Sequence, residues 1–169
     1  MKKRNWKQLS VRAMLGLTAI VAFSIATFIK LRETALDRSN TILLVDSYSG
    51  VYGYRTESHP VYRSIMMKSG VDERAFWEPK HFTFGPHCAG YDRDFPFDDE
   101  KLIELSGKLP LFPRLAWLDF ASCENVTDAG ISSIPKSPNL EYIQLRGTSV
   151  TDSGVAQLQK RLPGVELKR

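Results

Sequence analysis

The residues that could do chemistry in this chain gather between positions 81 and 100. His81, His87 and Cys88 come first, and five acidic residues follow them: Asp92, Asp94, Asp98, Asp99 and Glu100. A thiol beside an imidazole and carboxylates could serve as a nucleophile with its base, or as a metal site. The third histidine, His59, lies further upstream. One alternative for this protein is therefore a hydrolase that uses His87 and Cys88.

The order of these residues does not assemble a catalytic site. His87 and Cys88 are adjacent, and neighbouring side chains on a strand point to opposite faces. Asp98 and Asp99 stand at an expected helix start, where carboxylates satisfy free N–H groups and favour the helix dipole. The sequence also lacks G-x-S-x-G, G-x-G-x-x-G, H-E-x-x-H and a phosphate-binding loop. We therefore expect no catalytic residues, with the hydrolase as the alternative.

The two cysteines do not predict a metal site. Cys88 and Cys123 are too few to hold zinc alone, and no C-x-x-C is present. We expect neither a metal nor another cofactor. In an oxidising compartment the two thiols could pair; the other interpretation makes Cys123 a small buried residue and Cys88 an unpaired thiol.

The charge distribution argues against nucleic-acid binding. The net charge is +4, but five of the 23 basic residues precede the first apolar segment: Lys2, Lys3, Arg4, Lys7 and Arg12. The rest of the chain holds 18 basic and 19 acidic residues. It therefore offers no basic stripe for a phosphate backbone, and we expect no nucleic-acid partner.

Two similar segments near the C-terminus indicate what positions the polar residues. They read C-E-N-V-T-D-A-G-I and G-T-S-V-T-D-S-G-V, and Pro113, Pro138 and Pro163 follow one another at a step of 25 residues. A step of about 20 to 29 residues is typical of leucine-rich repeats. Phe97-Asp98-Asp99 aligns with V-T-D as a degenerate earlier copy, with Asp98 as its helix cap and Thr127 and Thr151 as the caps of the later ones.

The alternation of apolar residues within these copies predicts parallel strands with one buried face. The expected core residues are Leu115, Leu118, Phe120, Cys123, Leu140, Ile143 and Leu145. The expected outward residues, and our candidate binding residues, are Trp117, Asp119, Tyr142, Gln144 and Arg146. Aromatic residues with arginine are typical of protein interfaces. The other interpretation is that these side chains only cover a short sheet.

The two V-T-D-x-G segments resemble the cysteine-containing leucine-rich-repeat subfamily, which includes F-box adaptors and relatives of ribonuclease inhibitor. The sequence shows no F-box, so the adaptor role does not follow. The whole layout resembles short membrane-anchored leucine-rich-repeat proteins of bacteria. The resemblance implies an α/β fold, a short solenoid of parallel strands plus helices with an N-terminal α+β cap, and a protein-binding scaffold without a cofactor.

An uncharged segment near the N-terminus predicts a membrane helix. The 17 residues from Ala13 to Ile29 carry no charge. At about 1.5 Å per residue they span about 26 Å, and Val11 and Leu31 extend them. The five basic residues before this segment outnumber Lys30, Arg32 and Arg38 after it. The positive-inside rule then places the N-terminus in the cytoplasm and the C-terminal domain outside it.

A cleaved signal peptide is the alternative to this anchor. Ala22, Ser24 and Ala26 imitate a cleavage site, but they lie inside the apolar segment, and bulky residues follow. We favour an uncleaved signal anchor.

The segment between the anchor and the copies predicts short elements. We expect the membrane helix to continue to Arg38 and to stop at Ser39-Asn40. Two strands, 41–45 and 51–55, should follow as a hairpin or as neighbours. A helix from Pro60 to Gly70 and a turn capped by Asp72 form the candidate cap, and residues 81–84 form the first strand under the copies. Tyr48, Tyr52 and Tyr54 face either a partner or the sheet.

These observations divide the chain into four parts. Residues 1–12 form a basic cytoplasmic tail, 13–31 the transmembrane helix, 32–80 a juxtamembrane and capping region, and 81–169 the leucine-rich-repeat domain. We expect a membrane-anchored, non-catalytic module that binds an unknown protein partner. The alternative to it, besides the hydrolase, is a structural envelope protein without a specific partner.

Overall fold

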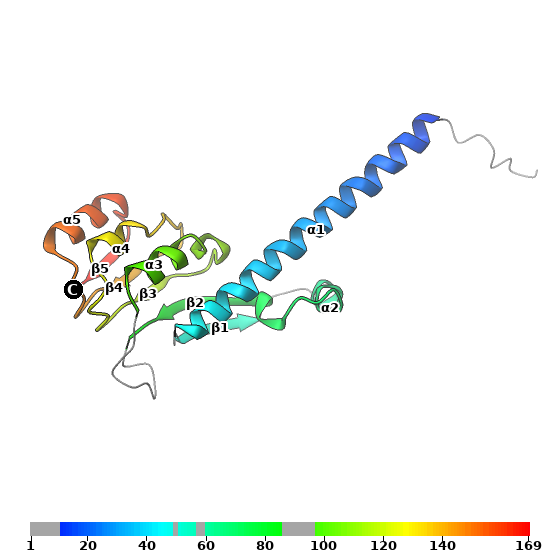
Figure 1. Ribbon diagram of the computed structural model, residues 1–169. Coiled ribbons are helices and arrows are strands. Elements are labelled where there is room, and N and C mark those ends of the chain that lie inside the picture. Colours follow the sequence, from blue (N-terminus) through cyan, green and yellow to red (C-terminus); the bar gives the residue numbers. More distant parts are fainter. Residues whose placement is uncertain (1–10, 49–50, 57–59, 86–96) are drawn as a thin grey trace, which may run out of the picture.

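The protein combines one long helix with a five-stranded sheet (Figure 1). The computed structural model describes residues 11–48, 51–56, 60–85 and 97–169. The strands lie in chain order across the sheet: β1 (Val51–Thr56), β2 (Trp77–Thr83), β3 (Trp117–Asp119), β4 (Tyr142–Gln144) and β5 (Glu166–Lys168). β1 pairs antiparallel with β2, and β2 to β5 are parallel. The expected α/β class with parallel strands is confirmed.

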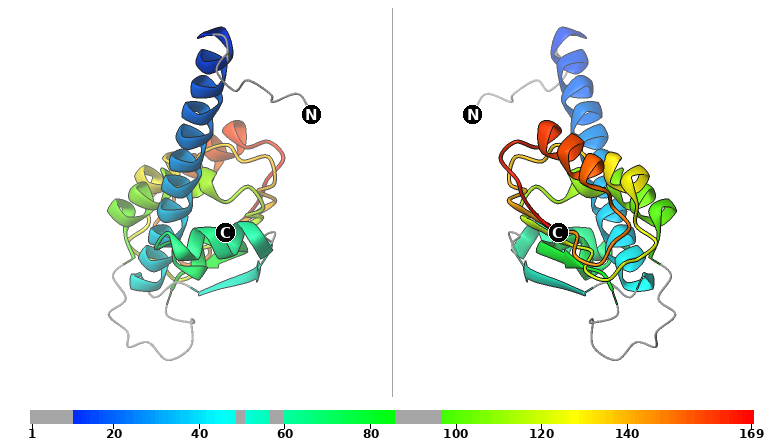
Figure 2. Two further views of the ribbon diagram at one scale, coloured as in Figure 1. Left: turned by 90° about the vertical axis from the view of Figure 1, so that its right-hand side faces the viewer. Right: turned by 90° about the vertical axis from the view of Figure 1, so that its left-hand side faces the viewer.

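The helices that connect the parallel strands form a layer on one side of them. The long helix is α1 (Val11–Ser47), and the others are α2 (Pro60–Lys68), η2 (Glu73–Phe76), α3 (Asp99–Ser106), η3 (Leu109–Leu111), α4 (Asp128–Ser132) and α5 (Asp152–Arg161). α3, α4 and α5 stand side by side (Figures 1 and 2). The end of α1 joins this layer beside α3, where the Tyr48 ring meets Phe97 edge to face at 5.8 Å between centroids.

The core lies between the sheet and this helix layer. All seven residues expected in it are buried, from Leu118 at 0% exposed to Leu140 at 5%. Phenylalanines fill its β2 end: Phe84 stacks on Phe97 at 4.3 Å between ring centroids and on Phe120 at 5.7 Å. A second, smaller cluster joins α1 to the segment of α2 and η2; its buried members are Ala35, Met66, Val71, Ala75 and Phe76.

The expected helix stop at Ser39-Asn40 and the strand at 41–45 are wrong, because α1 continues to Ser47. The buried residues here are spaced for a helix: Ser39, Ile42 and Val45 are at most 3% exposed, whereas Asn40 and Leu43 are exposed. The Thr41 hydroxyl donates to the Asp37 carbonyl at 2.7 Å, within the helix. Burial against the sheet therefore outweighs the preference of these β-branched residues for strands.

The expected pairing of strands 41–45 and 51–55 is wrong, because residues 41–45 are helical. The strand expected at 51–55 is confirmed as β1, and it pairs with a different strand. β1 pairs with β2, which begins at Trp77, four residues before the expected strand. The pairing is irregular between Gly53 and Tyr54, which lie opposite His81 and Pro79. This irregularity accommodates a proline that has no N–H to donate.

The three expected helix caps are confirmed. The side chain of Asp98 accepts from the Lys101 N–H at 3.0 Å at the start of α3. Thr127 and Thr151 do the same at the starts of α4 and α5, with the N–H groups of Ala129 and Gly154. Each cap satisfies an N–H group that has no partner within its own helix.

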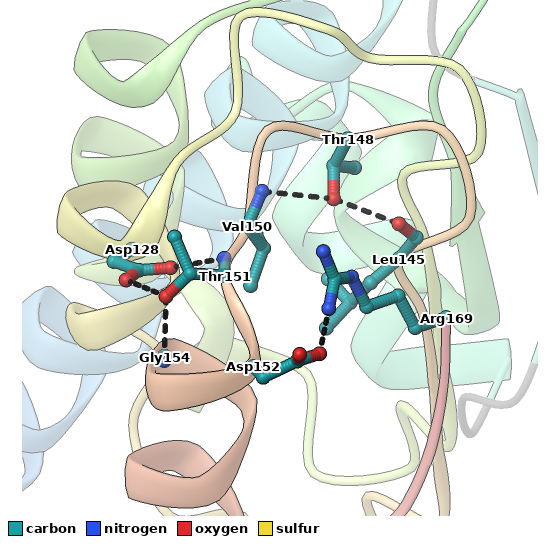
Figure 3. Close-up of polar contacts among 8 residues, drawn as sticks. All are labelled: Asp128, Leu145, Thr148, Val150, Thr151, Asp152, Gly154 and Arg169. Carbon is teal, nitrogen blue, oxygen red and sulfur yellow. Dashed lines mark hydrogen bonds and ion pairs between the residues drawn. The ribbon is translucent and has the colours of Figure 1, made fainter.

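The V-T-D-x-G segments make a ladder of contacts between neighbouring helices, which we call the Asp–Thr ladder. Figure 3 shows its second step, between Asp128 and Thr151. Asp99 accepts from the Thr127 N–H at 2.8 Å and the Thr127 hydroxyl at 2.5 Å. Asp128 accepts from the same two groups of Thr151 at 2.7 and 2.6 Å. The threonine thus caps its own helix, and the aspartate holds the threonine of the next one.

The glycine of the motif makes room for this aspartate. A Cβ atom on Gly130 would overlap the Asp99 carboxylate and lie 3.2 Å from the Asp99 Cα. A Cβ atom on Gly154 would overlap the Asp128 carboxylate in the same way. The aspartate, threonine and glycine therefore act together in joining neighbouring helices.

We predict that Gly130→Ala lowers the free energy of unfolding by about 1 to 3 kcal/mol, because the added methyl group overpacks the contact with Asp99. The measurement is urea denaturation of the full chain in detergent micelles. Gly164→Ala is the matched control, since nothing lies within 4 Å of a Cβ atom there. Equal stability of the two variants would contradict the role given to Gly130.

The ladder also predicts loss of stability in acid. The Thr151 hydroxyl, and then its N–H, hold the pKa of Asp128 below its usual 3.8. A carboxyl whose pKa is lowered by folding stabilises the protein above pH 3.8, and this contribution is lost as the pH falls through the folded-state pKa. We therefore expect Asp128→Asn to weaken the fall in unfolding free energy below this pH, as measured by urea titrations. Thr151→Val should weaken it too, and an unchanged slope in both variants would disprove the assignment.

Candidate functional site

The face of the sheet opposite the helices carries the candidate residues. Leu118 and Ile143 are fully buried on the helix side, whereas the residues on either side of them face outward. Strand register sets these outward residues in two rows. One row runs His81, Trp117, Tyr142, Glu166, and the other runs Thr83, Asp119, Gln144, Lys168.

Trp117 and Tyr142 form the centre of this face. Their ring centroids lie 5.2 Å apart with planes inclined by 40°. Trp117 is 53% exposed, although it is the largest side chain of the face. Exposed aromatic rings of this kind contribute much apolar area to a contact at a low cost in side-chain entropy.

Of the other three candidate residues, Asp119 and Gln144 lie on strands as expected, whereas Arg146 lies on the turn after β4. Asp119 accepts from the N–H of Ala121 at 2.9 Å and so supports the turn after β3. Gln144 lies beside it in register and accepts from the Tyr142 hydroxyl at 3.4 Å. Arg146 is exposed on the turn after β4, where its carbonyl accepts from the Ser122 N–H at 2.7 Å.

A hollow of about 680 Å³ lies beside Trp117 at the start of strands β3 and β4. Its lining combines Trp117 with side chains of both charges and with polar ones: Lys80, Arg114, Glu141, His81 and Asn139. Backbone hydrogen bonds fix the lining, since the Ala116 N–H donates to the Lys80 carbonyl at 2.8 Å and the Glu141 N–H to the Ala116 carbonyl at 2.9 Å. The hollow therefore offers an aromatic ring together with side chains of both charges.

Sequence reasoning missed Lys80, Arg114 and Asn139 as members of this site. Arg114 and Asn139 hold the same position in the 25-residue spacing, because each directly follows one of the spaced prolines, Pro113 and Pro138. This spacing could have predicted that the two side chains lie near each other. The Asn139 side chain donates to the Pro113 carbonyl at 2.5 Å, which joins the two proline turns. His81 was considered only for catalysis, but the register places it beside Trp117.

The residues considered for catalysis or metal binding are only partly described. His59, His87, Cys88, Asp92 and Asp94, and with them the pair on which the hydrolase alternative depends, lie outside the described residues. Of the others, Asp98 and Asp99 act in a helix cap and the Asp–Thr ladder, and Cys123 is buried in the core. Across the described ranges, no three His, Cys, Asp or Glu side chains gather in a possible metal site.

Of the three tyrosines expected to face either a partner or the sheet, Tyr48 packs against the protein core. Tyr48 donates to Glu104 of α3 and contacts Phe97. Burial, together with this hydrogen bond, raises the pKa of Tyr48 well above its usual range. The side chains of Tyr52 and Tyr54 lie outside the described part of the structure.

Comparison with known proteins assigns no function to this face. No protein-family model matches the chain, and no curated protein matches it either. The function must therefore be argued from the geometry of the sheet face and of α1.

We predict that Trp117→Ala lowers the free energy of unfolding by about 1 kcal/mol or less, because it removes one partly exposed ring pair. Leu118→Ala, one residue away on the buried face, should cost about 2 to 5 kcal/mol. Urea denaturation of the full chain in micelles measures both. Similar losses for the two variants would mean that Trp117 serves the packing of the sheet.

Proposed function

We propose that this protein is a single-pass membrane protein whose leucine-rich-repeat domain binds another protein, without catalysis, through the exposed sheet face. The observation that carries the proposal is the half-exposed Trp117, set against Tyr142 at the edge of the hollow. A large exposed aromatic pair beside a recess is typical of binding surfaces.

The regular spacing of contacts supports the leucine-rich-repeat interpretation. The Phe120 N–H donates to the Gln144 carbonyl at 3.0 Å, and one step of 25 residues later the Leu145 N–H donates to the Lys168 carbonyl at 2.7 Å. The Asp–Thr ladder joins α3 to α4 and α4 to α5 with the same atoms. In this interpretation β1 belongs to the N-terminal cap, since it covers the outer edge of β2.

α1 supports the membrane anchor. Its 37 residues extend about 55 Å, and it is the one helix in the described ranges that is long and apolar enough to cross a membrane. Every large apolar side chain of residues 13–31 is at least 45% exposed, except that of Phe28 at 38%. The hydroxyls of Thr18, Ser24 and Thr27 donate to carbonyls of the preceding turn, as polar groups in lipid require.

The proposed orientation rests on charge. The basic residues before Ala13 would remain in the cytoplasm, and the sheet would then lie on the other side of the membrane. The proposed partner is therefore an extracytoplasmic or membrane protein. The hollow carries Lys80 and Glu141 beside Trp117, which favours a partner segment with a charged or polar group beside an apolar one.

The test is crosslinking and co-purification from native membranes with three forms of the chain. Wild type is compared with Tyr142→Ala/Arg146→Ala on the sheet face and with the control Gln157→Ala/Lys160→Ala on exposed positions of α5. We expect wild type and the control to capture the same partner, and the sheet-face variant to lose most of it.

Two outcomes would contradict the proposal. Equal capture by all three forms would move the binding site away from this face. No specific capture by wild type would favour the alternative of a structural envelope protein. Circular dichroism of each purified form must first show an unchanged fold, so that a lost partner is not a lost structure.

A further inference from the structure

α2 exposes an unusual amount of apolar surface for a helix of nine residues. Val61 is 60% exposed, Ile65 49% and Met67 45%. On its other side, buried Met66 and half-buried Tyr62 belong to the small cluster with α1. The helix is therefore fixed to the protein along one side and presents apolar side chains on its flanks.

α2 packs beside the part of α1 where the uncharged segment ends. A groove of about 330 Å³ is lined by Phe23, Phe28 and Leu31 of α1 and by Tyr62, Ile65 and Met66 of α2. Just after it, the Arg32 Nε donates to the Ser69 carbonyl at 3.1 Å. Because the uncharged segment of α1 ends at Ile29, α2 lies level with the last turns of that segment and the first charged residues.

The apolar surface of α2 is thus continuous with that of the segment proposed to cross the membrane. Ile65 shares the groove with Phe23 and Phe28, and each of these three side chains is 38% exposed or more. Exposure of this apolar surface to water is unfavourable. Lipid chains can cover it on both helices at once.

The charges around α2 suit the headgroup region of a bilayer. Lys30 and Lys68 are exposed at the same level, and long lysine side chains reach phosphates while their stems stay in apolar surroundings. Arg63 is paired with Glu73 of η2, which offsets its charge. An apolar flank with cationic residues beside it is typical of helices that lie in the membrane interface.

We propose that α2 lies in the interface of the same membrane that α1 crosses, with Val61 and Ile65 among the lipid chains and Lys68 near the phosphates. This inference rests on the proposed spanning role of α1. The domain would then contact the bilayer at a second place beside its anchor. The molecules that cover the exposed apolar side of α2 are phospholipids.

The test places an environment-sensitive fluorophore at single cysteines in the full chain. Cys88 is replaced by serine, and Cys123 is spared from labelling by its burial. The labelled positions are Ile65→Cys, with Val61→Cys as a second reporter, Ile25→Cys in α1, and Ser132→Cys on the exposed side of α4. Each protein is reconstituted in vesicles of phosphatidylcholine and phosphatidylglycerol, with or without nitroxide-labelled lipid.

We expect blue-shifted emission and loss of most fluorescence to nitroxide lipid at positions 61, 65 and 25, and neither effect at position 132. If position 25 is quenched and positions 61 and 65 respond only to a water-soluble quencher, the interfacial role of α2 is wrong while the anchor stands. If position 25 is not quenched, the spanning role itself fails. Shielding of positions 61 and 65 from both quenchers would show that protein covers them, which also overturns the inference.

Discussion

The packing of the second half of α1 on the sheet is the contact on which the rest of the arrangement depends. Ile42 and Val45 are fully buried in the main core. Arg38 donates to the Trp77 carbonyl at 2.7 Å and the Glu78 carboxylate at 2.8 Å, and its guanidinium lies over the Phe112 ring. The same helix also carries the long apolar segment. One continuous helix therefore contributes to the core at its C-terminal end and forms the proposed membrane anchor at its N-terminal end.

The V-T-D-x-G segments form the contacts between neighbouring helices. The threonine satisfies its helix start, the aspartate holds the next threonine, and the glycine leaves space for the previous aspartate. The segment at Phe97 agrees with this explanation. It has Lys101 where α4 has Gly130, and the neighbour of α3 on that side is the end of α1, through Tyr48 and Glu104. No glycine is needed where an aspartate does not approach.

The sequence predicted those parts of the fold that depend on neighbours close in the chain. The caps at Asp98, Thr127 and Thr151 and the alternation around Leu118 and Ile143 are local patterns, so they could be read directly. The helix at Thr41–Val45 could not, because its composition favours a strand and only burial under the distant sheet decides its form. The hollow beside Trp117 was missed for a similar reason: strand register, and no sequence motif, brings Lys80 and Arg114 together.

The absence of a break in α1 between Val11 and Ser47 limits where the sheet can go. A flexible linker would let the domain sample a large volume, and the effective concentration of its binding face near any one target would fall with linker length. A stiff helix instead confines the domain of the proposed anchored protein to a shallow layer above the bilayer. In the proposed anchored state the search for a partner becomes two-dimensional, and partners in the same membrane are met far more often than those diffusing freely in solution.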